Sequence, residues 1–176
     1  MIAPDDHRTA IVVEVPAAED CIASLCARRG PAAGPAIPAH LTILYPFMEP
    51  AAVDDGVLGR LAGAVADVAP FRFTLTHVDA FPEVVILAPH PAAAFSDLVA
   101  RVCAAFPGFP PYEGRHARVV PHVTVAHVRP DERAAVVALA ASLLPAGGIT
   151  SECRALTVME NASGRWLPWR RVPLGG

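Results

Sequence analysis

Two short motifs in this sequence combine a histidine with a threonine at the spacing of one β-strand face. The first motif is His40-Leu41-Thr42 and the second is His122-Val123-Thr124. Residues i and i+2 of a strand share a face, so each motif would present an imidazole and a hydroxyl side by side. The apolar residue between them would point into the opposite, buried face. The spacing therefore predicts two strands that each offer one histidine and one threonine to a common site.

Two histidines with two hydroxyl groups suit the hydrolysis of a 2′,3′-cyclic phosphate or a related ribose phosphodiester. One imidazole must take a proton from water, and the other must give a proton to the leaving ribose oxygen. Unperturbed histidine titrates near pH 6.5, so a pair can hold one neutral and one charged ring near neutrality. Threonine hydroxyls can donate to the non-bridging phosphate oxygens. We expect His40 and His122 to be catalytic, Thr42 and Thr124 to bind phosphate, and no metal or other cofactor to be required.

A third histidine–threonine pair provides an internal control. His7-Arg8-Thr9 has the same spacing, but its middle residue is charged and it lies near a chain end, so we expect no catalytic role. The histidines outside these motifs show no H-x-H or H-E-x-x-H spacing, and the four cysteines form no C-x-x-C pair. The sequence therefore predicts no metal site.

Strand and helix patterns alternate along the chain in an order that would place each motif on a strand. The predicted strands are 9–15, 40–47, 71–76, 84–87, 119–128, 155–160 and 165–172. The predicted helices are 17–29, one from Asp54 or Asp55 to about residue 65, 95–106 and 131–144. Both halves, 9–80 and 84–160, then have the order strand, helix, loop, strand, helix, strand. This order predicts an internal duplication within one domain, residues 1–176, built of two pseudo-symmetric lobes.

Three segments, 38–47, 109–112 and 120–127, together carry a resemblance to a known family. With their two H-x-T motifs in apolar strands, they resemble the two-histidine phosphoesterase superfamily, which includes 2′-5′ RNA ligase-like proteins and cyclic nucleotide phosphodiesterases. The resemblance spans nearly the whole chain. It implies a bilobal α+β fold with two antiparallel β-sheets facing across a central groove and helices packed outside. It also implies that His40 and His122 are the catalytic pair and that Thr42 and Thr124 hold phosphate.

One position departs from the ligase branch of this superfamily. That branch tends to carry arginine three residues after the second motif's threonine, where this chain has His127. The departure favours hydrolysis over RNA ligation. Three alternatives stay open: a non-catalytic RNA-end or nucleotide-binding protein, a 3′-end RNA exonuclease of the same superfamily, and a metal-dependent hydrolase.

Four further residues are candidates for substrate binding: Tyr45, Tyr112, Arg118 and His127. Tyr112 lies in a proline-rich loop before the second motif, where its ring could stack on a base. Arg118 could approach a phosphate. Ordinary packing or solvation is the alternative for each of them, and His127 would face away from His122 on a regular strand.

Composition restricts the partners of the protein. With 14 basic and 17 acidic residues, a formal net charge of −3 and a sequence pI near 6.1, the chain has no basic field to hold duplex DNA. From the acidic N-terminal residues we expect no signal peptide, and no apolar run is long enough to predict a bilayer-spanning segment. We expect a cytoplasmic protein that binds a small nucleotide or an RNA end bearing a phosphodiester, with no membrane partner. The oligomeric state does not follow from the sequence.

Overall fold

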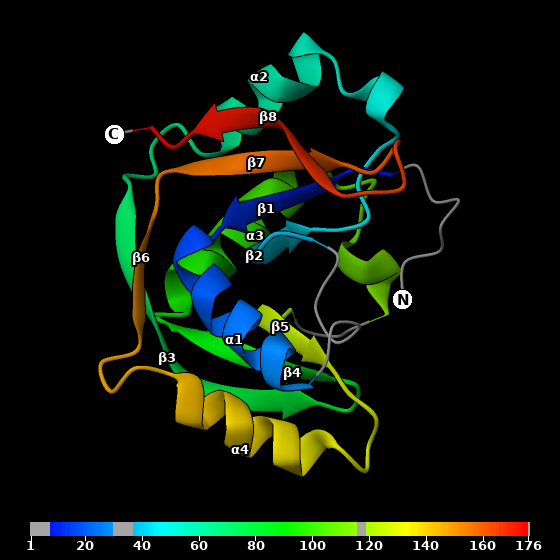
Figure 1. Cartoon of the computed structure of the whole chain (residues 1–176). Coiled ribbons are helices and arrows are strands. Elements are labelled where there is room, and N and C mark those ends of the chain that lie inside the picture. The colour runs from blue at the N-terminus through cyan, green and yellow to red at the C-terminus, as the bar shows by residue number, and fades with distance from the viewer. Residues whose placement is uncertain (1–7, 30–36, 116–118, 176) are drawn as a thin grey trace.

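Antiparallel strands form one curled sheet in the computed structural model of the chain, which describes residues 8–29, 37–115 and 119–175 (Figure 1). Within these ranges the sheet has eight strands in the order β6-β3-β4-β5-β2-β1-β7-β8. The strands are β1 (Ala10–Glu14), β2 (His40–Leu44), β3 (Phe71–Phe81), β4 (Val84–His90), β5 (Val123–His127), β6 (Ile149–Cys153), β7 (Ala155–Glu160) and β8 (Leu167–Pro173).

The helices of the described residues complete an α+β fold, as predicted. They are α1 (Glu19–Arg29), α2 (Asp55–Ala64), α3 (Ala93–Ala105) and α4 (Arg133–Leu143), with short 3-10 turns η1 (Pro16–Ala18), η2 (Pro50–Ala52) and η3 (Pro111–Gly114). Asp54 caps α2, because its carboxylate accepts from the Val57 N–H at 2.8 Å. None of these helices is long and apolar enough to cross a bilayer.

The sheet has the same arrangement on both sides of the neighbouring strands β2 and β5. We call β2-β1-β7-β8 the first lobe and β5-β4-β3-β6 the second lobe. β3 comes from the first half of the chain but pairs with β4 in the second lobe, while β7 comes from the second half and pairs with β1 in the first. A duplication in which the two halves of the chain exchanged their last strands would produce this order. The duplication itself stays a prediction.

The two separate sheets that the resemblance implied are one sheet in the structure. β2 and β5 join the lobes through a single antiparallel pair, Leu41 with Val123. Without this joint each lobe would end in an unpaired edge of backbone N–H and C=O groups, which pairing satisfies. The two histidine–threonine motifs therefore lie at adjacent strands in the middle of the sheet.

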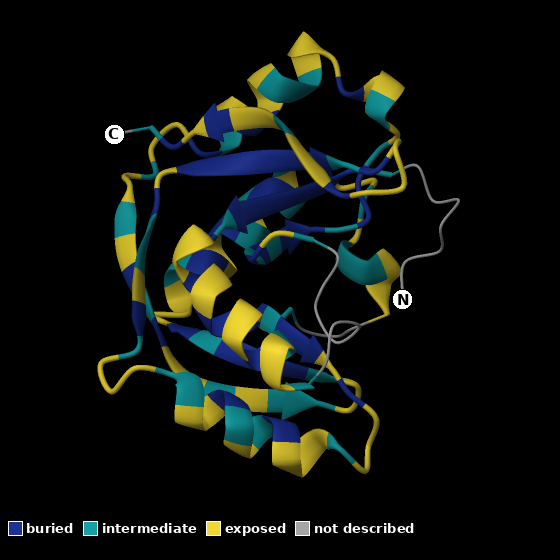
Figure 2. Cartoon of the chain, in the orientation of Figure 1, coloured by how far each residue is buried: buried dark blue, intermediate teal, exposed yellow. Residues whose placement is uncertain are grey.

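Each lobe is covered by helices that come from both halves of the chain. α1 packs against β5 and α4, and α4 packs against β3 and β4, which places α4 beside the second lobe in Figure 1. α3 packs against β2 and α2, and α2 packs against β8 of the first lobe. The interior is apolar, and Figure 2 shows the inner strands β1 and β7 largely buried while the helices expose one side. Since Leu41, Ile43, Val123 and Val125 are buried at alternate positions, the polar motif residues occupy the other positions of these strands.

One strand was missed and two predicted strand boundaries are wrong, each for an identifiable reason. The strand β6 was not predicted, because Ile149-Thr150-Ser151-Glu152-Cys153 is largely polar and pairs only with β3, at the edge of the sheet. β5 begins at Val123 rather than at 119, after Pro121, which has no N–H to donate to a neighbouring strand. β3 extends to Phe81 rather than to residue 76, since it pairs with β4 along its second part.

Candidate active site

The joint between β2 and β5 brings the four motif residues together. His40 is the first residue of β2, and His122 directly precedes β5. Continuing the Leu41–Val123 register by one residue in each direction sets His40 opposite Thr124 and Thr42 opposite His122. All four side chains are half-buried. The structure therefore groups two imidazoles and two hydroxyls around one strand joint.

Both imidazole rings are held by the same local contact. Nδ1 of His40 lies 2.7 Å from the carbonyl oxygen of Pro38, and Nδ1 of His122 lies 2.7 Å from that of Val120. A carbonyl oxygen only accepts, so each Nδ1 must carry the hydrogen. In the neutral form of each ring, Nε2 therefore carries no hydrogen and acts as an acceptor. Nε2 takes no part in the contact with the carbonyl. Each histidine can take a proton at Nε2, or donate one there once it is charged.

The electrostatic surroundings of the two rings are related but unequal. Burial lowers the pKa of His122, and the Val120 carbonyl partly opposes this. Burial also lowers the pKa of His40, which the Pro38 carbonyl raises, the charge of His122 lowers and the charge of Glu19 raises. The two rings are thus close enough to influence each other's charge. The ring of Phe81 lies edge-to-face against His122, with centroids 5.1 Å apart, and restricts its rotation.

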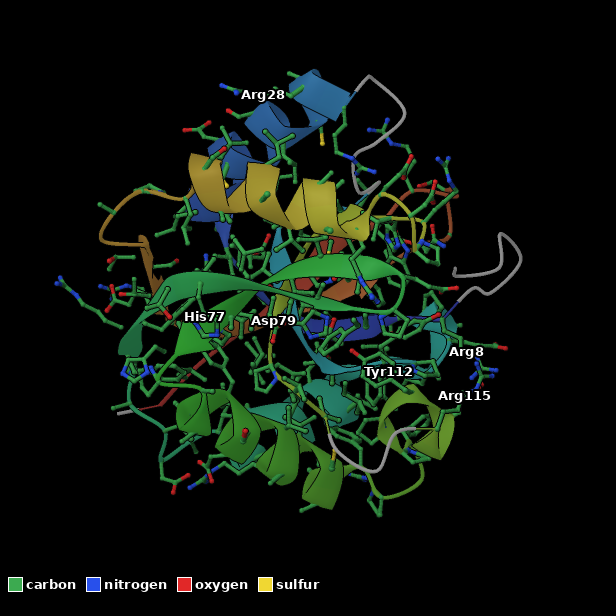
Figure 3. The ribbon with its side chains drawn as sticks, turned by 90° about the horizontal axis from the view of Figure 1, so that it is seen from below. Arg8, Arg28, His77, Asp79, Tyr112 and Arg115 are labelled. Atoms are coloured by element: carbon green, nitrogen blue, oxygen red, sulfur yellow. The ribbon has the colours of Figure 1, made fainter. Side chains whose placement is uncertain are left out.

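Tyr112 reaches the site from a left-handed turn. Tyr112, Glu113 and Gly114 have φ values of 50°, 56° and 74°, and such a conformation costs a non-glycine residue about 1–2 kcal/mol. The Tyr112 N–H donates to the Tyr45 carbonyl at 2.6 Å, which ties the turn to the end of β2. Glu113 forms ion pairs with Arg8 and Arg115, and Figure 3 shows these arginines beside Tyr112.

The phenol of Tyr112 contacts a motif residue directly. Its side chain is hydrogen-bonded to that of Thr42, and burial raises the pKa of the phenol. The sequence made this ring a candidate for stacking on a base, and the structure brings its hydroxyl to a candidate phosphate-binding group.

The remaining sequence candidates have different positions. Tyr45 is half-buried and packs edge-to-face on Trp166, with centroids 5.9 Å apart. His127 is exposed at the far end of β5 from His122, and its carbonyl accepts from Arg29 at 3.0 Å. Arg118 and the control His7 lie outside the described residues. Of the three candidates that the structure describes, Tyr112 is therefore the one whose side chain it connects to the motifs.

Sequence reasoning missed Glu19. Its Oε1 accepts from the backbone N–H of Ala39, the residue before His40, at 2.6 Å. Nothing in the sequence marks this glutamate, which occupies the first turn of a helix as acidic residues commonly do. In the described part of the chain, no three His, Cys, Asp or Glu side chains are grouped so that they could hold a metal ion.

A family comparison accounts for this arrangement. The model of the 2′-5′ RNA ligase superfamily matches residues 13–165. The paired motif strands and the α+β fold are those of a two-histidine phosphoesterase, and the chain belongs to the 2′-5′ RNA ligase superfamily. No curated protein matches the sequence significantly.

Solved structures of similar fold agree with this membership. Escherichia coli LigT complexed with 3′-AMP has a TM-score of 0.66 and 21% identity, over 97% of this chain and 99% of that chain. The protein TT0787 of Thermus thermophilus has a TM-score of 0.58 and 18% identity, over 96% and 98%. Usb1 of Kluyveromyces marxianus has a TM-score of 0.57 and 10% identity, over 96% and 98%. At these identities the likeness is one of fold.

Proposed function

We propose that this protein is a metal-independent phosphoesterase that hydrolyses a 2′,3′-cyclic phosphate, or a related ribose phosphodiester, on a nucleotide or RNA end. One observation carries the proposal. Two imidazoles with Nδ1 hydrogen-bonded to a carbonyl in the same way stand beside one strand joint, each opposite a threonine hydroxyl. A general acid, a general base and donors for the phosphate oxygens are then available together.

The reaction uses these groups in one in-line displacement. Nε2 of the neutral histidine takes a proton from water as the water oxygen attacks phosphorus. The bond from phosphorus to one ribose oxygen breaks, and that oxygen receives the proton of the charged histidine. Thr42 and Thr124 donate to the non-bridging oxygens, where negative charge accumulates. General acid–base catalysis contributes roughly 10²–10⁴-fold per group.

The comparisons support a small nucleotide or an RNA end as the ligand. Structures of Escherichia coli LigT, which align with 97% of this chain, were determined with 3′-AMP, ATP and NADP⁺. All three contain a ribose and a phosphate. We infer that the corresponding ligand of this chain is a small nucleotide or an RNA end, which agrees with the modest net charge of −3.

The test is turnover of the four nucleoside 2′,3′-cyclic phosphates and of short RNAs with cyclic ends. Wild type should hydrolyse at least one, and His40→Ala and His122→Ala should each lose at least about 10²-fold in kcat. The double variant should be far less than multiplicatively worse, since the two groups act together. His90→Ala, which removes an exposed histidine at the end of β4, is the control.

Two results would contradict the proposal. Binding of these compounds without hydrolysis would indicate a nucleotide-binding protein. Loss of activity in EDTA that a divalent cation restores would replace acid–base catalysis by Lewis-acid catalysis.

A further inference from the structure

The two histidines have matching local contacts but different neighbours along the chain. Each Nδ1 is bonded to the carbonyl two residues earlier at 2.7 Å. The residue before His40 is Ala39, whose N–H donates to Glu19 at 2.6 Å. The residue before His122 is Pro121, which has no N–H and cannot form the equivalent bond. A carboxylate is therefore bound beside one motif at a position where the other motif cannot hold one.

Ala39 is held through both of its backbone polar groups. Its N–H donates to Glu19, and its carbonyl accepts from the Val15 N–H at 2.8 Å. Val15 and Glu19 flank η1, so the segment between β1 and α1 clamps the residue that enters β2. Ala39 is buried. Because His40 follows directly, this clamp sets the backbone on which its imidazole stands.

We infer that Glu19 is a positioning residue for His40 and supports His40 as the general base of the pair. The inference rests on the proposed phosphoesterase function. Glu19 would act in two ways: its oxygen holds the backbone before the ring, and its negative charge stabilises the imidazolium that forms when Nε2 takes the proton from water. His122 then supplies the proton of the leaving ribose oxygen.

The charged and titratable groups around His40 in the described residues come from several elements. Glu19 lies at the start of α1, and His122 lies across the strand joint. Glu14 is the register partner of His40 on β1, and its carboxylate accepts from the Thr157 hydroxyl at 2.9 Å. The phenol of Tyr112, which belongs to η3, is bonded to the side chain of Thr42 in the same motif.

Both rings are available in the neutral form near neutrality, because burial lowers the pKa of each. A general base must start neutral, and the described part of the structure shows a carboxylate bound beside the His40 motif alone. Glu19 raises the pKa of His40 and so keeps this base strong enough to accept a proton.

The experiment is an NMR titration of the His40 and His122 rings in wild type, Glu19→Gln and Asp20→Asn. Glutamine keeps an oxygen for the Ala39 N–H and removes the charge. Asp20 occupies the same first turn of α1 and is exposed, so its variant removes an equal charge from the same helix end. Variants lacking each histidine assign the two signals.

We expect the midpoint of His40 to move to lower pH in Glu19→Gln only, while that of His122 stays in place. An unmoved His40 midpoint, or an equal shift in Asp20→Asn, would overturn the inference. This readout needs no turnover, so it stays informative if wild type hydrolyses none of the substrates and the proposed function fails.

The pH dependence of kcat with 2′,3′-cyclic AMP then tests the assignment of the base. The acidic limb should move to lower pH in Glu19→Gln with the alkaline limb unchanged, and kcat should fall about two- to fivefold. Glu19→Ala also releases the clamp and should lose about tenfold or more, with a normal thermal melt. Movement of the alkaline limb instead would overturn the assignment of His40 as base.

Discussion

At the scale of single residues, the orientation of each motif side chain depends on one near neighbour. The carbonyls of Pro38 and Val120 decide which ring nitrogen faces outward, and Tyr112 contacts the Thr42 hydroxyl. These contacts are short range and directional. Conservative substitutions can therefore separate the chemical role of a group from its contribution to packing.

The threonine hydroxyls should matter more than the threonine shape. Valine keeps the β-branch that suits a strand but cannot donate to a phosphate oxygen, whereas serine keeps the donor. We expect Thr42→Val and Thr124→Val each to lower kcat by roughly 10–10³-fold, and the serine variants to lose much less. The measurement is kcat on one cyclic phosphate, with thermal melts to verify folding. Equal activity of valine and serine variants would reduce the site to two histidines.

Tyr112 should act through its hydroxyl rather than through its ring. Tyr112→Phe removes the bond to Thr42 and keeps the ring, and we expect kcat to fall about 2–10-fold with KM nearly unchanged. Tyr112→Leu removes both features and should be no better. If Tyr112→Phe behaves as wild type while Tyr112→Leu raises KM, stacking on a base is the correct role.

At the scale of elements, the edge strand β6 depends on the glycine turn that follows α4. Gly148 has a φ of +74°, and a Cβ added there would lie 2.4 Å from the carbonyl oxygen of Leu75 on β3. Gly147, its neighbour, has no atom within 4 Å of such a Cβ and no positive φ. The chain approaches β3 so closely that glycine is required at position 148, whereas it is not required at position 147.

This difference predicts unequal effects of alanine at the two glycines. Gly148→Ala should lower the free energy of unfolding by about 1–3 kcal/mol, through both the backbone conformation and the close contact. Gly147→Ala should be nearly neutral. Urea denaturation of both variants measures the difference, and equal stabilities would mean that the turn adapts to a side chain.

For the molecule as a whole, the two half-buried motif histidines should influence the free energy of unfolding. Burial lowers the pKa of both rings, so the unfolded chain binds protons more readily than the folded one. Their contribution is complete above the unfolded pKa near 6.5 and is lost as pH falls through the lowered folded pKa.

The melting temperature of wild type should therefore fall more steeply between about pH 7 and pH 5 than that of the His40→Ala/His122→Ala double variant. Acidic side chains contribute to both proteins alike, so the difference in slope isolates the two rings. Parallel curves would mean that the rings titrate alike in the folded and unfolded chains.

The motifs and, apart from β6, the order of strands and helices could be predicted from the sequence alone, while the α+β class followed from the family resemblance of the motif segments. The motifs and the order of elements depend on local patterns: alternation about Leu41 and Val123, helical spacing in α3, and the capping aspartate of α2. Local patterns failed where a polar edge strand, β6, owes its conformation to pairing with β3. Its backbone hydrogen bonds, rather than its side chains, make it a strand.

How the motifs meet and what surrounds them depends on contacts between segments that are far apart in the sequence. The single pair Leu41–Val123 makes one sheet of two lobes and sets each histidine opposite the other motif's threonine. Glu19 and Ala39, which the clamp joins, are 20 residues apart in the sequence. The bond between Tyr112 and Thr42 connects η3 with the first motif. Such contacts form when distant segments pack together, and no local pattern of residues encodes them.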